Sequence, residues 1–235
     1  MGFDLSVITS YWLLLARGLA NTILFSAGSI AGGLCIGVFL ALGQISRKRM
    51  LRMPARMLVE LLRNTPFLIQ LFLIYYALPS LGVSLSVATA ALLSLSLFAG
   101  TYFAESIRGA ISSVPRGQMD SARAVGMSYA LAMRRIIFPQ MLGYLLPALT
   151  NNMIGIVKFS SILSIITLPE VTMASQIVLG ETFSVTEAFT VTALLYWSLT
   201  TAITMGMSRL ERRTATHRLG AITISPAQLI VFNHK

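Results

Sequence analysis

Long apolar stretches separated by shorter charged ones dominate this chain. A helix needs about 20 apolar residues to cross a bilayer, and Leu19–Gln44 is long enough and free of charged residues. Asn64–Ala104 is also uncharged and long enough for two crossings, with a break at Pro79–Gly82 that is typical of a turn between helices. Ile136–Val157 and Ala188–Ser208 supply two more. The pattern predicts an all-α membrane protein with five crossings.

The expected boundaries divide the chain into three parts. Residues 1–18 are too short to cross, and Tyr11 and Trp12 suit an N-terminal interfacial helix. Residues 19–213 form the transmembrane domain, with a polar loop at 109–136 and a tail at 214–235. Phe159–Gly180 is interrupted by Pro169, which predicts an in-plane or re-entrant helix rather than a sixth crossing. The five predicted spans are about 19–44, 57–78, 83–108, 137–158 and 187–208.

Basic residues lie on one side of the predicted membrane. Of 18 Lys and Arg residues, five fall between the first two spans, five between the third and fourth, and five after the fifth. The other two connections contain none. The positive-inside rule therefore places these three regions in the cytoplasm, the N-terminus outside and the C-terminus inside.

Composition excludes several classes of protein. Only 11% of residues are charged, against about 25% in soluble domains, and the placement of the basic residues explains the +10 charge without nucleic acid. The single cysteine, Cys35, lies in an apolar run and cannot form an internal disulfide. No nucleotide-binding P-loop, metal cluster or protease constellation is found, so we expect no enzyme activity and no bound cofactor.

Two small-residue motifs occur in the first span. Gly28-x-x-x-Gly32 and Gly33-x-x-x-Gly37 let helix backbones approach closely. The close approach could serve packing within the subunit or contact with a second subunit.

The 109–136 loop has the pattern of a short exposed helix. Pro115 suits a helix start and Gly126 the position just past a helix end. Between them Gly117, Ser121 and Ala124 share one face. Arg116, Asp120 and Arg123 share another, with spacing for ion pairs, and Ser128 is the expected N-cap of a second helix that leads to Pro139. The smooth face suits a groove on a partner protein, although a solvated helical linker has the same pattern.

Here the chain resembles a known family. Asp120-Ser121-Ala122, three residues, Gly126, nine residues and Ile136-x-Phe138-Pro139 resemble the loop of ABC importer permeases named after its Glu-Ala-Ala motif. Asp120 replaces the Glu of the family motif, Ser121 replaces its first Ala, and Phe138 replaces a Leu. The spacing of the motif is the same. The segments Arg63–Leu71, Glu105–Ala110, Val114–Gln118, Lys158–Ser161 and Leu210–Arg213 are similar to the polar amino-acid branch of that family.

The resemblance implies a function and its partners. Such permeases translocate a substrate delivered by a periplasmic or lipid-anchored solute-binding protein across the bacterial inner membrane. Two permease subunits, identical or homologous, form the pathway, and ATP and Mg²⁺ are bound by two partner ATPases. The loop residues that would couple this chain to an ATPase are Arg116, Gly117, Gln118, Asp120, Ser121, Ala122, Arg123, Gly126 and Pro139.

Polar residues inside spans are costly and so are candidates for the substrate pathway. Amides can hydrogen-bond both the carboxylate and the ammonium of an amino acid, and Lys158 can attract a carboxylate. Interhelical hydrogen bonding is the alternative role for each of these residues. Glu60 and Arg63, like Glu105 and Arg108, are spaced as structural or gating ion pairs. The pathway candidates are Asn64, Gln70, Asn151, Asn152, Lys158 and Ser161.

Two other functions remain open from the residues alone. An ion-coupled secondary transporter needs an acid within the membrane, but Glu60 and Glu105 lie near the expected cytoplasmic ends. A structural membrane subunit or channel needs no partner ATPase. Neither explains the spacing in the 109–136 loop.

The family resemblance implies that the carried substrate is a polar amino acid or a related opine.

Overall fold

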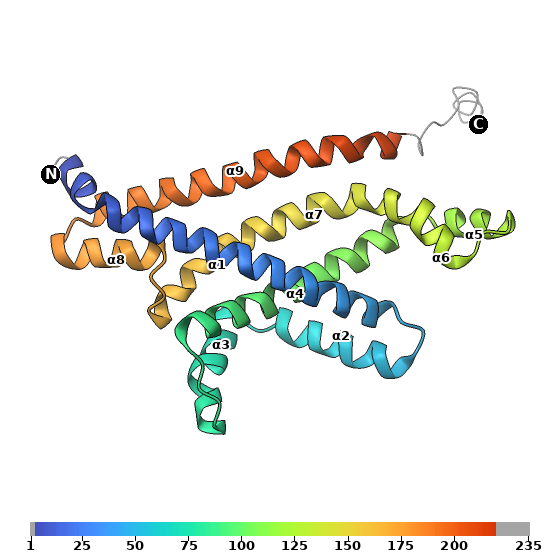
Figure 1. The fold of residues 1–235 in the computed structure, drawn as a ribbon, viewed down its shortest axis with the longest axis horizontal. Coiled ribbons are helices and arrows are strands. Elements are labelled where there is room, and N and C mark those ends of the chain that lie inside the picture. The colour runs from blue at the N-terminus through green and yellow to red at the C-terminus, as the bar shows by residue number, and fades with distance from the viewer. Residues whose placement is uncertain (1–2, 220–235) are drawn as a thin grey trace, which may run out of the picture. The chain divides into compact units, whose positions relative to one another are not determined.

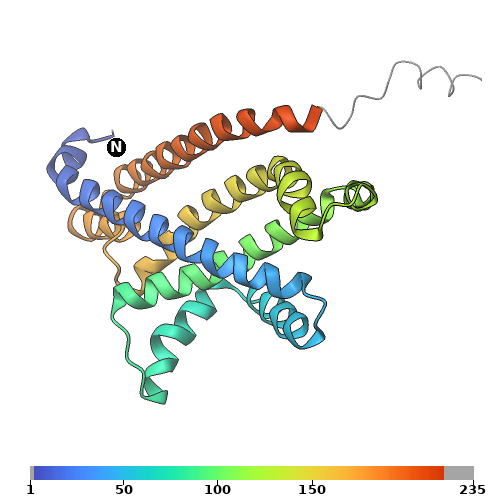
Figure 2. The same cartoon turned by 45° about the vertical axis from the view of Figure 1, so that its right-hand side comes forward.

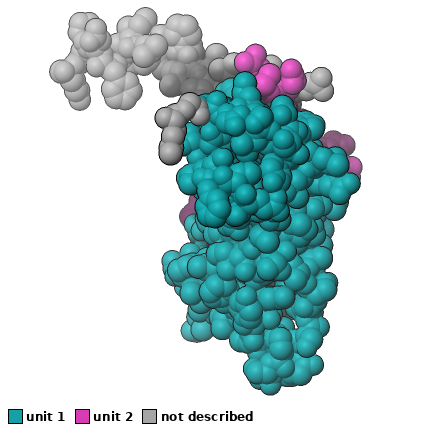
Figure 3. Space-filling view, turned by 90° about the vertical axis from the view of Figure 1, so that its left-hand side faces the viewer, with its two compact units in different colours: residues 1–108, 149–204 teal, residues 109–148, 205–235 magenta. Residues whose placement is uncertain are grey.

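The computed structural model describes residues 3–219, with side chains as far as Arg212, and these residues form helices and connecting turns without strands (Figure 1). Two compact units are distinguished (Figure 3). The first contains residues 1–108 and 149–204, and the second contains residues 109–148 and 205–235. Most of the expected tail at 214–235 lies outside the described residues.

The first helix is one continuous element. α1 runs from Leu5 to Ile45, 41 residues, and the Asp4 side chain caps its start by accepting from Ser6 N–H. α1 therefore continues through the expected boundary between an interfacial segment at 1–18 and a span at 19–44. No proline interrupts the helix, and Gly18 lets it pack directly on α8 (Val171–Thr182), where an added Cβ would lie 3.0 Å from the Cβ of Ala174.

The glycines of α1 pack within the subunit. α4 (Val87–Ser113) crosses α1, and a Cβ added at Gly33 would lie 2.6 Å from the Cβ of Ala99. A Cβ added at Gly37 would lie 2.7 Å from the Cβ of Phe103. Real Cβ atoms do not approach so closely, so these positions need glycine. In a membrane, where lipid is as apolar as leucine, such close packing stabilises helix pairs.

The second predicted span is broken. α2 (Arg49–Arg63) and the segment Phe67–Leu81 meet at a bend of 106°. Within that segment, α3 (Phe67–Phe72) is followed by a π turn (Leu73–Ala77) and a 3₁₀ turn (Leu78–Leu81). Proline disfavours helical backbone in the residue before it, which accounts for the break before Pro66. The helix also begins at Arg49 rather than near residue 57, because basic residues are good helix formers.

The C-terminal half supplies a short helix between two long ones. α7 (Phe138–Phe159) leads into a 3₁₀ helix (Ser160–Ile166), then α8, then α9 (Val185–Leu219). α8 has 12 residues, about 18 Å, which is too short to cross a bilayer. Figure 2 shows α1 beside α8 at one end and beside α2 at the other. A buried cluster joins α1, α8 and α9 through Leu15, Ala174, Val178, Ala188 and Val191.

A buried carboxyl group anchors the start of α8. Glu170 is fully buried, and its side chain accepts from Met173 N–H at 2.8 Å and from the Tyr196 hydroxyl of α9 at 2.7 Å. Val171 N–H donates to the Thr22 hydroxyl of α1 at 3.2 Å. Burial raises the pKa of Glu170 despite these hydrogen bonds. The contacts tie α8 to both long helices beside it.

The described residues contain four helices long and apolar enough to cross a membrane, or five if the bent pair counts as one span. The four are Leu5–Ile45, Val87–Ser113, Tyr129–Ile166 and Val185–Arg212. The five predicted spans each overlap one of these elements, and the bent pair covers the second.

Candidate functional site: the 109–136 loop and a polar pocket

A short capped helix stands in the loop of the second unit. α5 runs from Arg116 to Ala124, with Pro115 at its N-cap position. Gly126 has a φ of +83°, its N–H donates to Arg123 O at 3.0 Å, and Met127 N–H donates to Ala122 O at 3.1 Å. These two hydrogen bonds form a Schellman motif, which favours glycine at the left-handed position. The expected helix and its stop at Gly126 are confirmed.

One face of α5 is open. Ala122 is buried, whereas Gly117, Ser121 and Ala124 are exposed. No atom lies within 4 Å of a Cβ built at Gly117. The small-residue face predicted from the spacing is thus turned away from the rest of the second unit. Such a face offers a smooth surface to another molecule.

The ion pairs expected on α5 are not formed. Among the described residues the single ion pair within 4 Å is Arg108 with Glu105, so Asp120 pairs with neither Arg116 nor Arg123. All three side chains on α5 are exposed, where an ion pair is too weak to hold two long side chains in one geometry. They therefore remain available to a partner.

The segment after α5 is continuous with α7. α6 (Tyr129–Ala132) starts at Ser128, whose hydroxyl accepts from Leu131 N–H at 3.3 Å, as expected for an N-cap. A π turn (Met133–Ile137) then leads into α7 just before Pro139. Proline has no N–H and its ring crowds the preceding turn, which a wider turn accommodates. Gln140 of α7 donates to Gln118 of α5 at 3.2 Å and holds the two segments together.

A small pocket lies in the first unit. Its volume is 80 Å³, and α4 and α7 supply all of its lining residues. Asn152 donates to the Ser106 hydroxyl at 2.8 Å and to Tyr102 O at 3.4 Å, so its amide is used in packing α7 on α4. No hydrogen bond to Asn151 is found within residues 3–212, and this side chain is exposed. The lining residues are Phe98, Tyr102, Asn151, Asn152, Gly155, Ile156 and Phe159.

The structure brings only two of the six pathway candidates to this pocket. Asn64 is exposed at the C-cap of α2. Lys158 is exposed near the end of α7, and its carbonyl accepts from the Ser161 hydroxyl at 2.7 Å. The pocket that Asn151 and Asn152 line does not include the other four candidates, Asn64, Gln70, Lys158 and Ser161.

Gln70 stabilises the helix break. It is buried, and its Nε2 donates to Leu62 O at 2.6 Å and to Thr65 O at 2.9 Å. These carbonyls belong to the end of α2 and the Pro66 break, where the helix leaves backbone acceptors without partners. The amide nitrogen of Gln70 is therefore used in hydrogen bonds to the backbone at the helix break.

Aromatic side chains at the pocket were not singled out from the sequence. The rings of Phe67, Phe98 and Phe159 lie with centres 4.8 to 6.0 Å apart. The spacing of Phe98 and Tyr102, four residues apart, was the available signal, since such residues share one helix face. Arg63 lies over the Tyr102 ring and forms no ion pair with Glu60, whereas the Glu105–Arg108 pair is formed as expected.

Comparison with known proteins identifies the family. Residues 33–216 match the family described as "Binding-protein-dependent transport system inner membrane component", which is more than half of the chain. The chain belongs to the inner membrane permeases of binding-protein-dependent ABC importers. Among the side chains described, those of residues 3–212, no three His, Cys, Asp or Glu gather closely enough to hold a metal ion.

Individual permeases of this family resemble the chain over most of its length. "Probable amino-acid ABC transporter permease protein YckA" of Bacillus subtilis is 37% identical over 199 residues, 85% of this chain and 88% of the relative. "Probable glutamine ABC transporter permease protein GlnM" of the same organism is 32% identical over 210 residues, 89% of this chain and 97% of the relative. A solved amino acid ABC transporter structure, 33% identical, superposes with a TM-score of 0.85, covering 91% of this chain and 100% of the other.

Proposed function

We propose that this permease is the transmembrane subunit of an ATP-driven importer for polar amino acids. Family membership and the amino-acid and glutamine transport in the names of its relatives support this substrate class. We assign neither ATP binding nor ATP hydrolysis to this chain. ATP hydrolysis belongs to two partner ATPases, a second permease completes the pathway, and a solute-binding protein delivers the substrate.

The observation that carries the coupling proposal is the open face of α5. Gly117, Ser121 and Ala124 present a surface without large side chains, and the Schellman motif at Gly126 stops the helix sharply behind it. A short rigid helix of this kind transmits displacement without bending. When ATP closes the ATPase dimer, α5 moves with the ATPase that grips it, and the spans connected to it rock between two orientations.

The proposed orientation follows the basic residues. The 109–136 loop and the α1–α2 connection carry clusters of Lys and Arg, and we place both in the cytoplasm with the C-terminus. α5 then faces the compartment that contains ATP, as its coupling role requires. The N-terminus and α8 face the exterior, where a binding protein arrives.

Asn151 is our candidate for substrate contact. Its amide lines the pocket and forms no hydrogen bond within the described residues, whereas Asn152 is held by Tyr102 and Ser106. The pocket volume of 80 Å³ is below the roughly 300 Å³ of ordinary ligand sites. It therefore accommodates one polar group of a passing substrate, and the pathway widens as the spans move.

Substitutions at Gly117 test the coupling role directly. A Cβ built there has no neighbour within 4 Å among the described residues, so a leucine changes the docking face with little strain on the fold. In proteoliposomes with both ATPases, the second permease and the binding protein, we expect Gly117→Leu to lower uptake and substrate-stimulated ATP hydrolysis about tenfold or more. Gly117→Ala keeps the face small and is expected to retain both activities.

Two controls sharpen the experiment. Gly206→Leu places the same side chain at another exposed helical glycine with open space around it, and we expect normal coupling. Gly126→Val also damages the loop, but it adds strain at a φ of +83° and is the less specific variant. Full transport and stimulated hydrolysis by Gly117→Leu would show that α5 is not the coupling element. Uptake that requires an ion gradient and no ATP would instead support a secondary transporter.

A further inference from the structure

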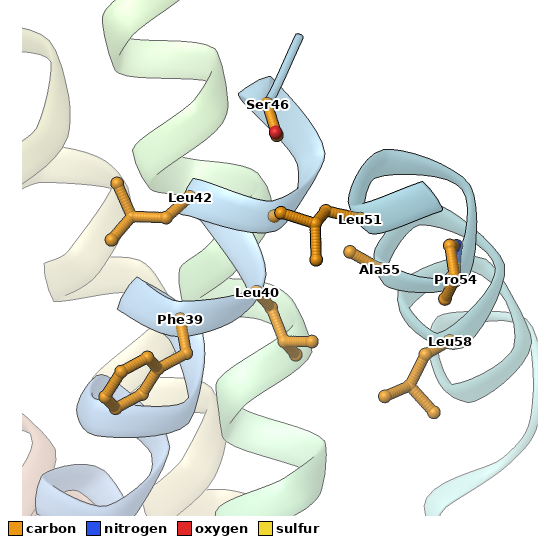
Figure 4. Close-up of a pocket in the computed structure, with 9 residues that line it drawn as sticks. Phe39, Leu40, Leu42, Ser46, Leu51, Pro54, Ala55 and Leu58 are labelled. Carbon is orange, nitrogen blue, oxygen red and sulfur yellow. The ribbon is translucent and has the colours of Figure 1, made fainter. Parts of the chain in front are cut away.

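An apolar groove lies where the end of α1 meets α2. Its volume is 460 Å³, and Leu40, Gly43, Leu51 and Leu58 are among its lining residues. Figure 4 shows these two helices forming its walls, with Leu51, Ala55 and Leu58 on the α2 side. Phe39, at its edge, is 75% exposed, so the groove is open and its apolar surface is not covered by the described part of the chain.

Positive charge gathers at the same place. Arg47, Lys48, Arg49, Arg52 and Arg56 follow one another around the α1–α2 turn, and the stretch from Leu5 to Val59 contains no Asp or Glu. None of the five forms an ion pair within the part of the chain that the structure describes. Unpaired basic residues beside an apolar groove match a ligand that is both anionic and apolar.

The start of α2 calls for an anion in addition. Its N-cap residue, Lys48, makes no side-chain capping bond, and no acidic residue stands in the first turn. A helix N-terminus carries partial positive charge and free N–H groups, so basic residues there are unfavourable without an anion. A negatively charged partner at the first turn is therefore favourable.

Two donors in the same helices, outside the groove lining, lack acceptors. Gln44 is 3% exposed and follows the groove residue Gly43, while Arg52 follows the groove residue Leu51. The Nε2 of Gln44 and the Nε of Arg52 are buried without a hydrogen-bond partner among the described residues. Such donors are rare in folded proteins, but these two atoms are buried away from the groove lining, so the proposed site does not include them.

We propose that this groove binds an anionic phospholipid. An acyl chain lies along the apolar walls, and the phosphate lies at the Arg47–Arg52 turn, where Lys and Arg side chains and the start of α2 hold it. Basic pockets between transmembrane helices bind anionic headgroups in this way. The lipid belongs to the cytoplasmic leaflet if the proposed orientation is correct, and its binding is independent of the transport function.

Native mass spectrometry of the full chain, released from nanodiscs of equal phosphatidylglycerol and phosphatidylcholine, tests the proposal. The wild-type chain is expected to retain phosphatidylglycerol about tenfold over phosphatidylcholine. Equal retention of the two lipids would overturn the proposal without any variant. Glycerol phosphate, which lacks acyl chains, is expected not to displace the lipid, and displacement would mean a site for a free anion only.

Matched variants locate the site. We expect Arg49→Ala with Arg52→Ala to weaken phosphatidylglycerol retention about tenfold, because two headgroup contacts are lost. Arg209→Ala with Arg212→Ala removes the same charge from the exposed end of α9 and is expected to have no effect. Leu58→Gln makes the groove polar and weakens retention, whereas Leu61→Gln, exposed on α2 outside the groove, does not. Equal losses within either pair would contradict the assignment.

A protein occupant is the other outcome. In a Cys35→Ser background, Leu58→Cys is expected to remain free of disulfide crosslinks in membranes that contain the assembled transporter. A crosslink from this position to a second permease or to an ATPase subunit would mean that protein fills the groove, and the lipid proposal would fall.

Discussion

The guanidinium carbon of Arg63 lies 5.2 Å from the centre of the Tyr102 ring, which lines the polar pocket. Arg63 thus pairs with an aromatic face of α4 rather than with Glu60 on its own helix. The ring also packs on Phe98, with centres 4.8 Å apart. This contact links the broken helix at α2 to the pocket wall.

The Arg63–Tyr102 contact is expected to contribute measurably to stability. A double-mutant cycle with Arg63→Gln and Tyr102→Leu should give a coupling free energy of about 0.5–1 kcal/mol, since Arg63 is exposed. Tyr102→Phe keeps the aromatic face and should keep the coupling. Chemical unfolding in detergent measures it, and a coupling of zero would mean that the two side chains are merely adjacent.

The two pocket asparagines should behave differently. Asn151→Ala is expected to raise the KM for uptake several-fold with little change in thermal unfolding, because its amide is not engaged within the described chain. Asn152→Ala should instead destabilise the chain by about 1–2 kcal/mol, since it leaves Ser106 and Tyr102 O without their donor. Uptake kinetics and thermal unfolding of both variants separate the roles, and matching behaviour would refute this distinction.

The glycines between α1 and α4 should tolerate no side chain. Gly37→Leu is expected to destabilise the chain by about 1–3 kcal/mol or to prevent folding, because its Cβ would overlap the Cβ of Phe103. Cys35→Leu, on an exposed position of the same helix, adds similar bulk and should fold normally. Folded yield by size-exclusion chromatography and thermal unfolding are the measurements. A well-folded Gly37→Leu chain would contradict the close packing.

Burial of Glu170 should make stability depend on pH. Its folded pKa is raised above the ordinary value of 4.5, so the folded state holds a proton that the unfolded state releases. Stability is therefore fully present below 4.5 and falls as the pH rises from there through the folded pKa. Glu170→Gln cannot ionise and should lack this fall.

The comparison isolates Glu170 from other titrating groups. Thermal unfolding of the wild type and of Glu170→Gln, measured from about pH 4 to about pH 8, should show a difference that grows in favour of the variant as the pH rises. A constant difference across this range would mean that Glu170 titrates alike in the folded and unfolded chains.

Local sequence patterns predict much of the architecture. Uncharged apolar runs of sufficient length predict helices that cross the membrane, because a helix satisfies its backbone groups within one segment. Pro115, Gly126 and Ser128 predict the ends of α5 and the start of α6 from backbone chemistry alone, and the structure has them there. The family resemblance rests on the spacing of the same loop.

Packing decided what local patterns leave open. The glycines of the first span serve α4 of the same chain, and Gln70 holds a helix break, because side chains distant in sequence meet there. The continuous α1 arises likewise, since contact of Gly18 with α8 supports a helix well beyond bilayer length. The sequence determined where the long apolar helices and the capped helices of the 109–136 loop lie along the chain. Only tertiary structure decided which polar groups are used in packing and which, like Asn151, have no hydrogen-bond partner among the described residues, because that depends on neighbours that the chain order does not specify.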